Sequence, residues 1–283
     1  MVRIGVVVVT HASDDVLPPL LEGLATHEPD AHVVVVDSAS PDGPPEVGAV
    51  ELLACAENRG YAAAANRGAA ALAPLRCDHL AFLQPDVRIA GPTLTQLADA
   101  LDARPEVGIA TGPVVDTSGR RLPAAWGPTS VRRALVFAAG FEPVRMRSAA
   151  GAMLRRVPVS DVSRVQDDVK VEGHVGGGTM VVRRACFDEL GGFDEAFFLY
   201  WEDADLCARA RAAGWSVRVL PATPFVDLQD GAGSNLAEDD VRWEYFSSGA
   251  LRFGAKHLVP GQARQLEAAL SLGRRLKHVR ERG

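Results

Sequence analysis

Short runs of β-branched apolar residues alternate with segments of helical spacing along the first part of the chain. The runs predict buried strands at residues 4–9, 32–36, 79–83 and 108–111, and the spacing predicts helices at 16–24, 61–72 and 93–101. Continuous apolar runs are typical of strands that are covered on both faces, as in parallel sheets. The pattern therefore predicts an α/β fold, with a Rossmann-like, mostly parallel central sheet flanked by helices.

Two aspartates stand where predicted strands end. Asp37 follows residues 32–36, and Asp86 closes the triplet Gln84-Pro85-Asp86 after residues 79–83. In open parallel sheets, ligands bind outside the carboxyl ends of the strands, so both side chains are candidates for a ligand site. The alternatives are local: an Asx-turn at Asp37 and a capped turn at Asp86.

The middle of the chain is harder to interpret. Residues 117–170 contain several prolines and no clear periodicity, which favours an acceptor-binding insertion and a disordered connector about equally. A strand at 180–182 and a helix starting after Arg183-Arg184 follow. Gly177 and Gly178 precede this strand, where glycine allows close approach of a ligand or forms a bulge.

Residues 191–215 carry the strongest chemical signal. A glycine turn leads into an aromatic, hairpin-like segment, and a helix is predicted from Asp203 to 213, with Gly214 at its end. Glu202, Asp203 and Asp205 lie at the helix start, and Asp205 can form an exposed pair with Arg209. Charge alone favours acids that interact with the helix dipole, whereas a catalytic base is the functional alternative.

Composition narrows the classes of protein. The chain has 283 residues and a net charge of -6, which argues against a nucleic-acid partner. Its four cysteines are scattered and form neither a zinc motif nor a disulfide framework, as expected for a reducing cytoplasm. The first apolar run is too short for a signal peptide or a spanning helix.

The C-terminal segment at 262–282 has helical spacing and becomes basic toward its end. Such a tail can contact an anionic membrane, here the inner face of the plasma membrane, or can remain a solvated terminal helix.

Several motifs occur in a characteristic order. They are the strand end Val9-Thr10, the turn at 36–40, Asn58-Arg59-Gly60-Tyr61 with Asn66-Arg67-Gly68, Gln84-Pro85-Asp86, and residues 191–215. Together, the motifs resemble family 2 glycosyltransferases with the GT-A fold, particularly the rhamnosyltransferase-like branch. The resemblance covers about residues 3–257, including a closing helix at 243–257.

The resemblance implies an inverting transfer from a nucleoside-diphosphate sugar, such as a dTDP- or UDP-sugar of the dTDP-rhamnose kind. The acceptor would be a hydroxyl of a glycan, a lipid-linked molecule or a natural product. Residues 1–115 would form the donor-binding half, 116–257 the acceptor-binding and catalytic half, and 258–283 the basic helical tail. The sequence does not determine the oligomeric state, and a homodimer is one alternative.

The resemblance also implies roles for individual residues. Asp203 would be the general base. Asp86 would bind Mg²⁺ or Mn²⁺, with Gln229 or Asp230 as a further ligand. The implied donor-binding residues are Thr10, Asp37, Asn58, Gly60, Tyr61, Asn66, Gln84 and Asp86, and the acceptor or sugar pocket would contain Gly177, Gly178, Trp201 and Glu202. A buried core position is the alternative for Trp201.

Two positions depart from the family pattern. Gln84 stands where relatives have an acid or asparagine, and Gln229 stands where they have a histidine. Glutamine is the weaker ligand for a transition metal, so a relative that binds a nucleotide sugar without turnover is one alternative. A nucleotidyltransferase is another, although the glycine-rich phosphate loop expected after the first strand is missing.

Overall fold

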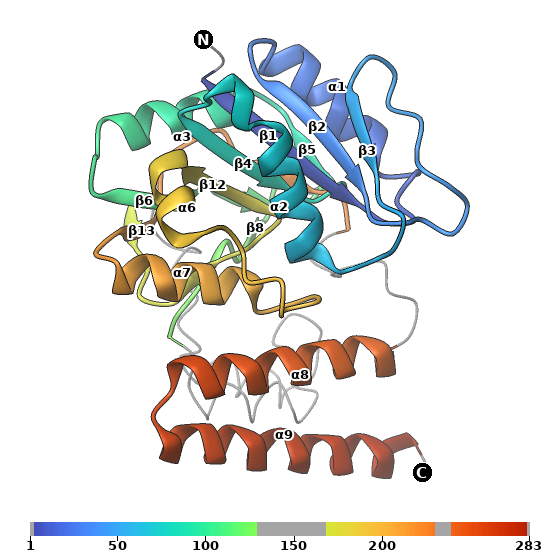
Figure 1. The fold of residues 1–283 in the computed structure, drawn as a ribbon, viewed down its shortest axis with the longest axis vertical. Coiled ribbons are helices and arrows are strands. Elements are labelled where there is room, and N and C mark those ends of the chain that lie inside the picture. Colours follow the sequence, from blue (N-terminus) through green and yellow to red (C-terminus); the bar gives the residue numbers. More distant parts are fainter. Residues whose placement is uncertain (1–2, 129–167, 230–238, 282–283) are drawn as a thin grey trace.

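The computed structural model describes residues 3–128, 168–229 and 239–281 (Figure 1). The predicted acceptor-binding insertion therefore lies mostly outside the described residues, as does Asp230.

The described residues form a central sheet with the strand order β10-β13-β6-β12-β4-β1-β2-β3. Its strands are β1 (Ile4–Thr10), β2 (His32–Asp37), β3 (Glu51–Ala54), β4 (His79–Leu83), β6 (Val107–Thr111), β10 (Val169–Lys170), β12 (Thr179–Arg183) and β13 (Ser216–Val219). In this sheet β12 and β10 run opposite to the other strands. The mostly parallel α/β sheet predicted from the sequence is thus confirmed.

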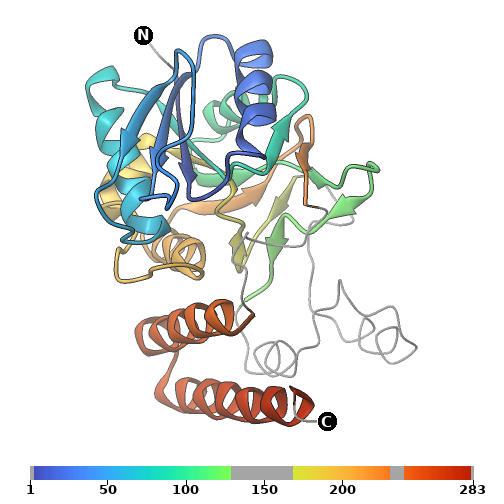
Figure 2. The same ribbon diagram turned by 90° about the vertical axis from the view of Figure 1, so that its right-hand side faces the viewer.

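Helices cover both faces of this sheet, as the two views show (Figures 1 and 2). They are α1 (Leu17–His27), α2 (Tyr61–Ala71), α3 (Thr93–Asp102), α6 (Arg184–Leu190) and α7 (Glu202–Ala212). Alternate side chains of β1 enter opposite cores, because side chains point to alternate faces along a strand. Val7 packs in the core with α2, α6 and α7, whereas Val6 packs with α1 and α3. This double burial explains the uninterrupted apolar run of β1.

Helix α2 lies unusually close to the sheet at Gly68. A Cβ atom added there would lie 2.4 Å from Cγ1 of Val7 and 3.0 Å from Cγ2 of Val36. Glycine therefore lets α2 rest on β1 and β2. This contact fixes the helix whose first residues enter the candidate site.

Short strands that the sequence did not predict form two smaller sheets. One contains β5 (Val87–Ile89), β14 (Phe225–Asp227), β7 (Val114–Val115) and β8 (Arg121–Leu122), and the other pairs β9 (Ala125–Trp126) with β11 (His174–Val175). A 3₁₀ turn, η1 (Ala73–Leu75), follows α2. The prediction of a hairpin-like segment after the glycine turn is wrong, because residues 193–201 form turns and bends without strands.

A helical hairpin, α8 (Asp239–His257) and α9 (Pro260–Glu281), lies beside the α/β body (Figure 1). Ala250 of α8 packs against Leu266, Ala269 and Leu270 of α9, with Trp201 of the body at the edge of the cluster. Among the described residues, no helix is both long enough and apolar enough to cross a bilayer.

The close contact at Gly68 gives a testable prediction. Gly68→Ala gains about 1 kcal/mol of helix propensity, but overpacking a filled core costs about 1–3 kcal/mol. Because the nearest atoms are methyl groups of buried, β-branched valines, we expect a net loss of about 1–2 kcal/mol in the free energy of unfolding. Urea denaturation measures this change. Ala70→Ser, at an exposed position of the same helix, is the control and should change stability by less than about 0.5 kcal/mol.

Candidate active site

The carboxyl ends of β1 and β2 bring Thr10 and Asp37 side by side, as paired residues of the parallel ladder. Thr10 is buried, and its Oγ1 atom has no hydrogen-bond partner among the described residues. The Asp37 carboxylate accepts hydrogen bonds from Ser40 N at 3.1 Å and Ser40 Oγ at 2.5 Å. These bonds come from the residue three positions after Asp37, whereas an Asx-turn uses the backbone amide two positions on. They hold the carboxylate at the sheet edge.

Asn58 connects this turn to the start of α2. Its Oδ1 atom accepts hydrogen bonds from Ser38 Oγ at 3.0 Å and from Gly60 N at 2.9 Å. Gly60 has a φ of 89°, and a Cβ atom there would lie 2.1 Å from the carbonyl oxygen of Phe198. Only glycine fits both the left-handed backbone and this close approach.

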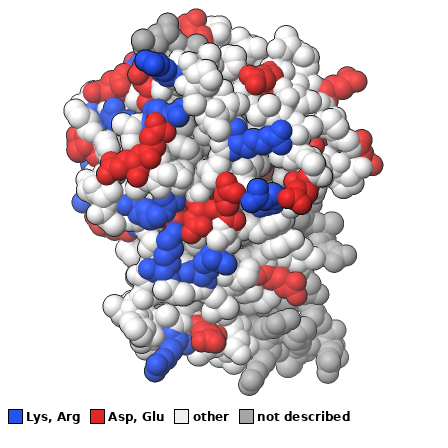
Figure 3. All heavy atoms as spheres, viewed as in Figure 1, with Lys and Arg blue, Asp and Glu red and all other residues white. Residues whose placement is uncertain are grey.

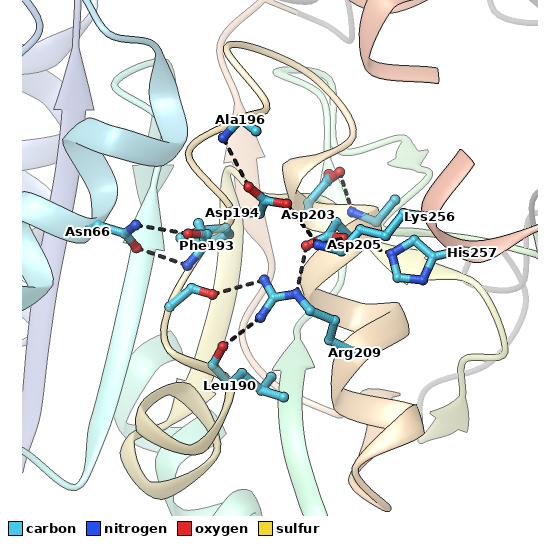
Figure 4. A network of polar contacts seen from close by, with 12 residues as sticks. Asn66, Leu190, Phe193, Asp194, Ala196, Asp203, Asp205, Arg209, Lys256 and His257 are labelled. Atoms are coloured by element: carbon cyan, nitrogen blue, oxygen red, sulfur yellow. Dashed lines mark hydrogen bonds and ion pairs between the residues drawn. The ribbon is translucent and has the colours of Figure 1, made fainter. Parts of the chain in front are cut away.

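Asn66 lies farther along α2 and fixes the loop after α6. Its Nδ2 atom donates to the Phe193 carbonyl at 2.9 Å and to Glu195 at 3.1 Å, while its Oδ1 atom accepts from Phe193 N at 2.9 Å (Figure 4). The amide of Asn66, predicted to bind the donor, is thus occupied by this loop.

Tyr61, Gly177 and Asp203 form a chain of contacts at the start of α7. The Tyr61 hydroxyl donates to the Gly177 carbonyl at 2.9 Å, and Gly177 N donates to Asp203 Oδ2 at 3.1 Å. Asp203 Oδ1 accepts from Ala204 N at 2.7 Å. Three predicted site residues that are far apart in sequence therefore meet, and the half-buried Asp203 carboxylate is oriented by backbone amides.

Glu202 is the buried neighbour of Asp203. Its side chain has a relative exposure of 6 %, and its Oε2 atom has no hydrogen-bond partner among the described residues. Burial, together with repulsion from Asp203, raises the pKa of Glu202 to about 8. Burial and the same two carboxylates also raise the pKa of Tyr61 well above its ordinary value. At neutral pH Glu202 therefore holds a proton.

Asp205, the third acid, is fully buried rather than exposed as predicted. Its carboxylate binds Arg209 at 2.7 Å, and it also binds Lys256 and His257 of α8, each at 2.7 Å (Figure 4). Burial alone would raise its pKa, but hydrogen bonds from Lys256, His257 and Arg209 hold the pKa of Asp205 below its usual range. Arg209 also donates to the carbonyls of Leu190 and Gly192. Asp205 thus joins α7 to α8 and to the glycine turn.

Trp201 packs against α8. Its ring centroid lies 5.3 Å from that of Phe246 and 5.2 Å from that of Phe253. Tyr200 and Trp201 both have left-handed backbones, with φ values of 68° and 73°. The structure therefore places Trp201 at the interface with α8, where it is half-buried.

Gln84 and Gly178 lie against each other at the end of β4. Gln84 N donates to the Gly178 carbonyl at 3.1 Å, and a Cβ atom at Gly178 would lie 2.4 Å from Gln84 Oε1. Asp86 follows on the same edge. Burial and repulsion from Asp227 raise the pKa of Asp86 to about 6.

Asp227 is a candidate ligand that the sequence interpretation missed. Strand β14 pairs with β5 and places Asp227 opposite Val87. Val87 directly follows Asp86 in the chain, so the two aspartates lie at the same edge. Leu228 N donates to the Asp86 carbonyl at 2.9 Å, and Gln229 N donates to Asp227 Oδ1 at 2.8 Å. Predicting strand β14 from the sequence would have identified Asp227, but three residues carry too little periodicity to predict a strand.

The oxygen donors at this edge suit a hard divalent cation. Asp86 and Asp227 contribute two carboxylates, and the Gln229 side chain lies close in sequence. In the described part of the chain, no three or more His, Cys, Asp or Glu side chains are grouped so that they could hold a metal ion together. Mg²⁺ and Mn²⁺ accept a few carboxylates, completed by water and phosphate oxygens, so the residues present fit such an ion.

Comparisons with known proteins identify similar chains and domains. The model of glycosyl transferase family 2 matches residues 5–163, and that of the N-terminal domain of galactosyltransferase matches residues 159–229. A relative from Mycobacterium tuberculosis, N-acetylglucosaminyl-diphospho-decaprenol L-rhamnosyltransferase, is 31% identical over 236 residues, which cover 77% of this chain and 73% of that protein.

Solved structures share the fold. The mannosyltransferase PcManGT from Pyrobaculum calidifontis, in complex with GDP-Man and Mn²⁺, has a TM-score of 0.56 at 18% identity, over 97% of this chain and 73% of that one. S. aureus TarS has a TM-score of 0.52 at 16% identity, over 95% of this chain. The match spans 42% of the TarS chain. At these identities the likeness shows the GT-A fold.

The match to the family model covers more than half of the chain, and the mycobacterial relative aligns over most of both proteins. The chain therefore belongs to glycosyl transferase family 2 and is a glycosyltransferase similar to rhamnosyltransferases.

Proposed function

We propose that the protein transfers a sugar, with inversion, from a nucleoside-diphosphate donor to an acceptor hydroxyl, and that Asp203 is the general base. The observation that carries this proposal is the pair of adjacent carboxyls at the start of α7. Asp203 is held by the amides of Gly177 and Ala204, whereas Glu202 is buried and its pKa is raised by burial and by the neighbouring Asp203. Environments that separate the ionisation of two neighbouring acids are typical of acid–base sites.

The chemistry follows from a single displacement. The acceptor oxygen attacks the anomeric carbon while Asp203 takes its proton, and the bond between that carbon and the diphosphate oxygen breaks. The diphosphate leaves with the bonding electrons, so no second carboxylate is required as an acid. A divalent cation held by Asp86 and Asp227, with Gln229 near them, would neutralise the charge that grows on the diphosphate.

The donor would bind along the carboxyl edge of the sheet. Thr10, Asp37, Asn58 and Gly60 would form the nucleotide pocket, and the proposal is supported by the pairing of Thr10 with Asp37 at this edge and by the buried Thr10 hydroxyl, which has no hydrogen-bond partner among the described residues. By analogy with the mycobacterial rhamnosyltransferase, we propose a dTDP- or UDP-sugar and a lipid-diphosphate acceptor. An enzyme acting on such an acceptor would work at the membrane surface, on its cytoplasmic side.

The role of Asp203 is tested by Asp203→Asn. Loss of a general base lowers the rate by about 10²- to 10⁴-fold, and we expect this loss in kcat while donor affinity changes little. Release of the nucleoside diphosphate from a donor panel gives the rate, and calorimetry gives the affinity. Asp188→Asn, an exposed carboxylate on α6, is the matched control and should keep full activity. Undiminished turnover in Asp203→Asn would remove Asp203 as the base.

The same experiment separates the proposal from a relative that binds the donor without turnover. Such a protein would bind the donor tightly and release no nucleoside diphosphate, with or without Mn²⁺, in the unsubstituted chain.

The protonated state of Glu202 predicts how stability depends on pH. Its folded-state pKa of about 8 lies above the ordinary glutamate value of 4.5, so the stability it contributes is full below about pH 4.5 and is lost as the pH rises through about 8. Glu202→Gln cannot ionise, and we expect it to flatten this decline. Urea unfolding of both proteins between pH 5 and 9 measures the difference. Parallel stability curves over that range would show that Glu202 is already ionised.

The two-carboxylate site predicts the effect of substitutions on metal binding. Asp86→Asn and Asp227→Asn each remove one charged ligand, so each should lower the affinity for Mn²⁺, in the presence of nucleoside diphosphate, by at least about tenfold. Electron paramagnetic resonance of free Mn²⁺ gives the affinity. Asp30→Asn, at an exposed position after α1, should bind Mn²⁺ like the parent. If Asp227→Asn bound Mn²⁺ as tightly as the parent, Asp227 would not be a ligand of the metal.

A further inference from the structure

A groove of about 700 Å³ runs between the loop 194–199 and one face of α8, outside the predicted donor and metal residues. We call it the α8 groove. Its walls include Phe197, Phe198 and Leu199 from the loop, and Tyr245, Leu251 and Arg252 from the helix. Two chain segments far apart in sequence thus form one open channel on the surface.

Apolar and polar surfaces line this groove in about equal parts. Phe198 and Tyr245 stack with ring centroids 4.5 Å apart, and Phe197 of the same loop is almost completely buried. Leu251 is one of the few large hydrophobic side chains that remain exposed among the described residues, with a relative exposure of 41%. A guest with apolar groups would cover these surfaces at a gain of about 25 cal/mol per Å².

One end of the groove is cationic. Arg252 and Lys256 lie one helical turn apart, at 6.0 Å and 5.9 Å from the Phe197 ring centroid. Lys256 is paired with Asp194 at 2.8 Å and Asp205 at 2.7 Å. Arg252 is exposed and has no carboxylate partner in the described part of the chain, so its charge is available to a ligand. Figure 3 shows basic side chains gathered where the α/β body meets the helical hairpin.

The loop that lines the α8 groove also leads to Asp203, the proposed general base. The loop continues from Leu199 through Tyr200 and Trp201 into the first turn of α7. A Cβ atom at Gly249 of α8 would lie 2.8 Å from the Tyr200 carbonyl, so helix and loop are in tight contact. The α8 groove and Asp203 therefore lie on one continuous, packed unit.

We propose that the α8 groove binds the phosphate-bearing stem of a polyprenyl-linked acceptor. Isoprenoid units would lie on Phe198, Tyr245 and Leu251, and a phosphate would bind Arg252, because a guanidinium forms strong paired hydrogen bonds with phosphate. A bare saccharide fits less well, since the aromatic rings stack on each other and Ser248 already donates to the Tyr245 carbonyl. This inference rests on the proposed function, for which it assigns a place to the acceptor lipid.

The test uses the full chain and farnesyl phosphate, without donor or metal. Calorimetry should show saturable binding, with weaker binding of farnesol and of inorganic phosphate, since each satisfies only one part of the groove. Arg252→Gln should weaken farnesyl phosphate binding by about tenfold or more, and Ser248→Trp should abolish it by filling the groove. Arg264→Gln, an exposed arginine on α9 outside the groove, is the matched control and should bind like the parent.

Two results would overturn the inference. One is parental binding in both Arg252→Gln and Ser248→Trp, when circular dichroism shows that both are folded. The other is an equal loss in Arg252→Gln and Arg264→Gln, which would indicate general attraction of anions to the hairpin. Failure of the proposed function would give another result. Farnesyl phosphate would still bind in the groove, but the protein would release no nucleoside diphosphate from any donor.

Discussion

The structure depends on one close contact, between Gly60 at the start of α2 and the loop that carries the acids. The Phe198 carbonyl accepts a hydrogen bond from Tyr61 N at 2.8 Å, at a point where any side chain on Gly60 would collide with it. Asn66 holds the same loop one turn farther along α2. Through these contacts the half of the chain that contains Asp37 is fixed against the half that contains Asp203.

Three carboxylates at the start of one helix would repel one another in water, yet the fold gives each a different state. Glu202 is buried without a charged partner and keeps its proton, which removes one negative charge beside Asp203. Asp205 is buried too, but Arg209, Lys256 and His257 compensate its charge. Asp203 remains half-buried, between two backbone amides. The three acids are thus in separate environments, and Asp203 is the one that accepts a hydrogen bond from Gly177 N.

Much of the fold was predictable because long elements carry strong periodic signals. The buried run of β1 and the glycine after α7 located elements within a residue or two. Short strands were not predictable, because β5 and β14 gain their order from pairing with each other rather than from local preference. For that reason Asp86 was identified as a candidate, but its neighbour Asp227 was not. The exposed Asp205 pair was wrong for a similar reason: the cover over it comes from α8, about fifty residues later in the chain.

The sequence by itself determined the α/β class and the order of the motifs, since these depend on local periodicity and on residues close together in the chain. The resemblance of those motifs to a known family then implied Asp203 as the candidate base. The tertiary structure decided which acid is protonated, which is paired and which lies beside Gly177. Ionisation depends on burial and on charges brought from distant segments. This burial and these charges are set only when three segments pack together, namely α2, α8 and the loop that precedes α7.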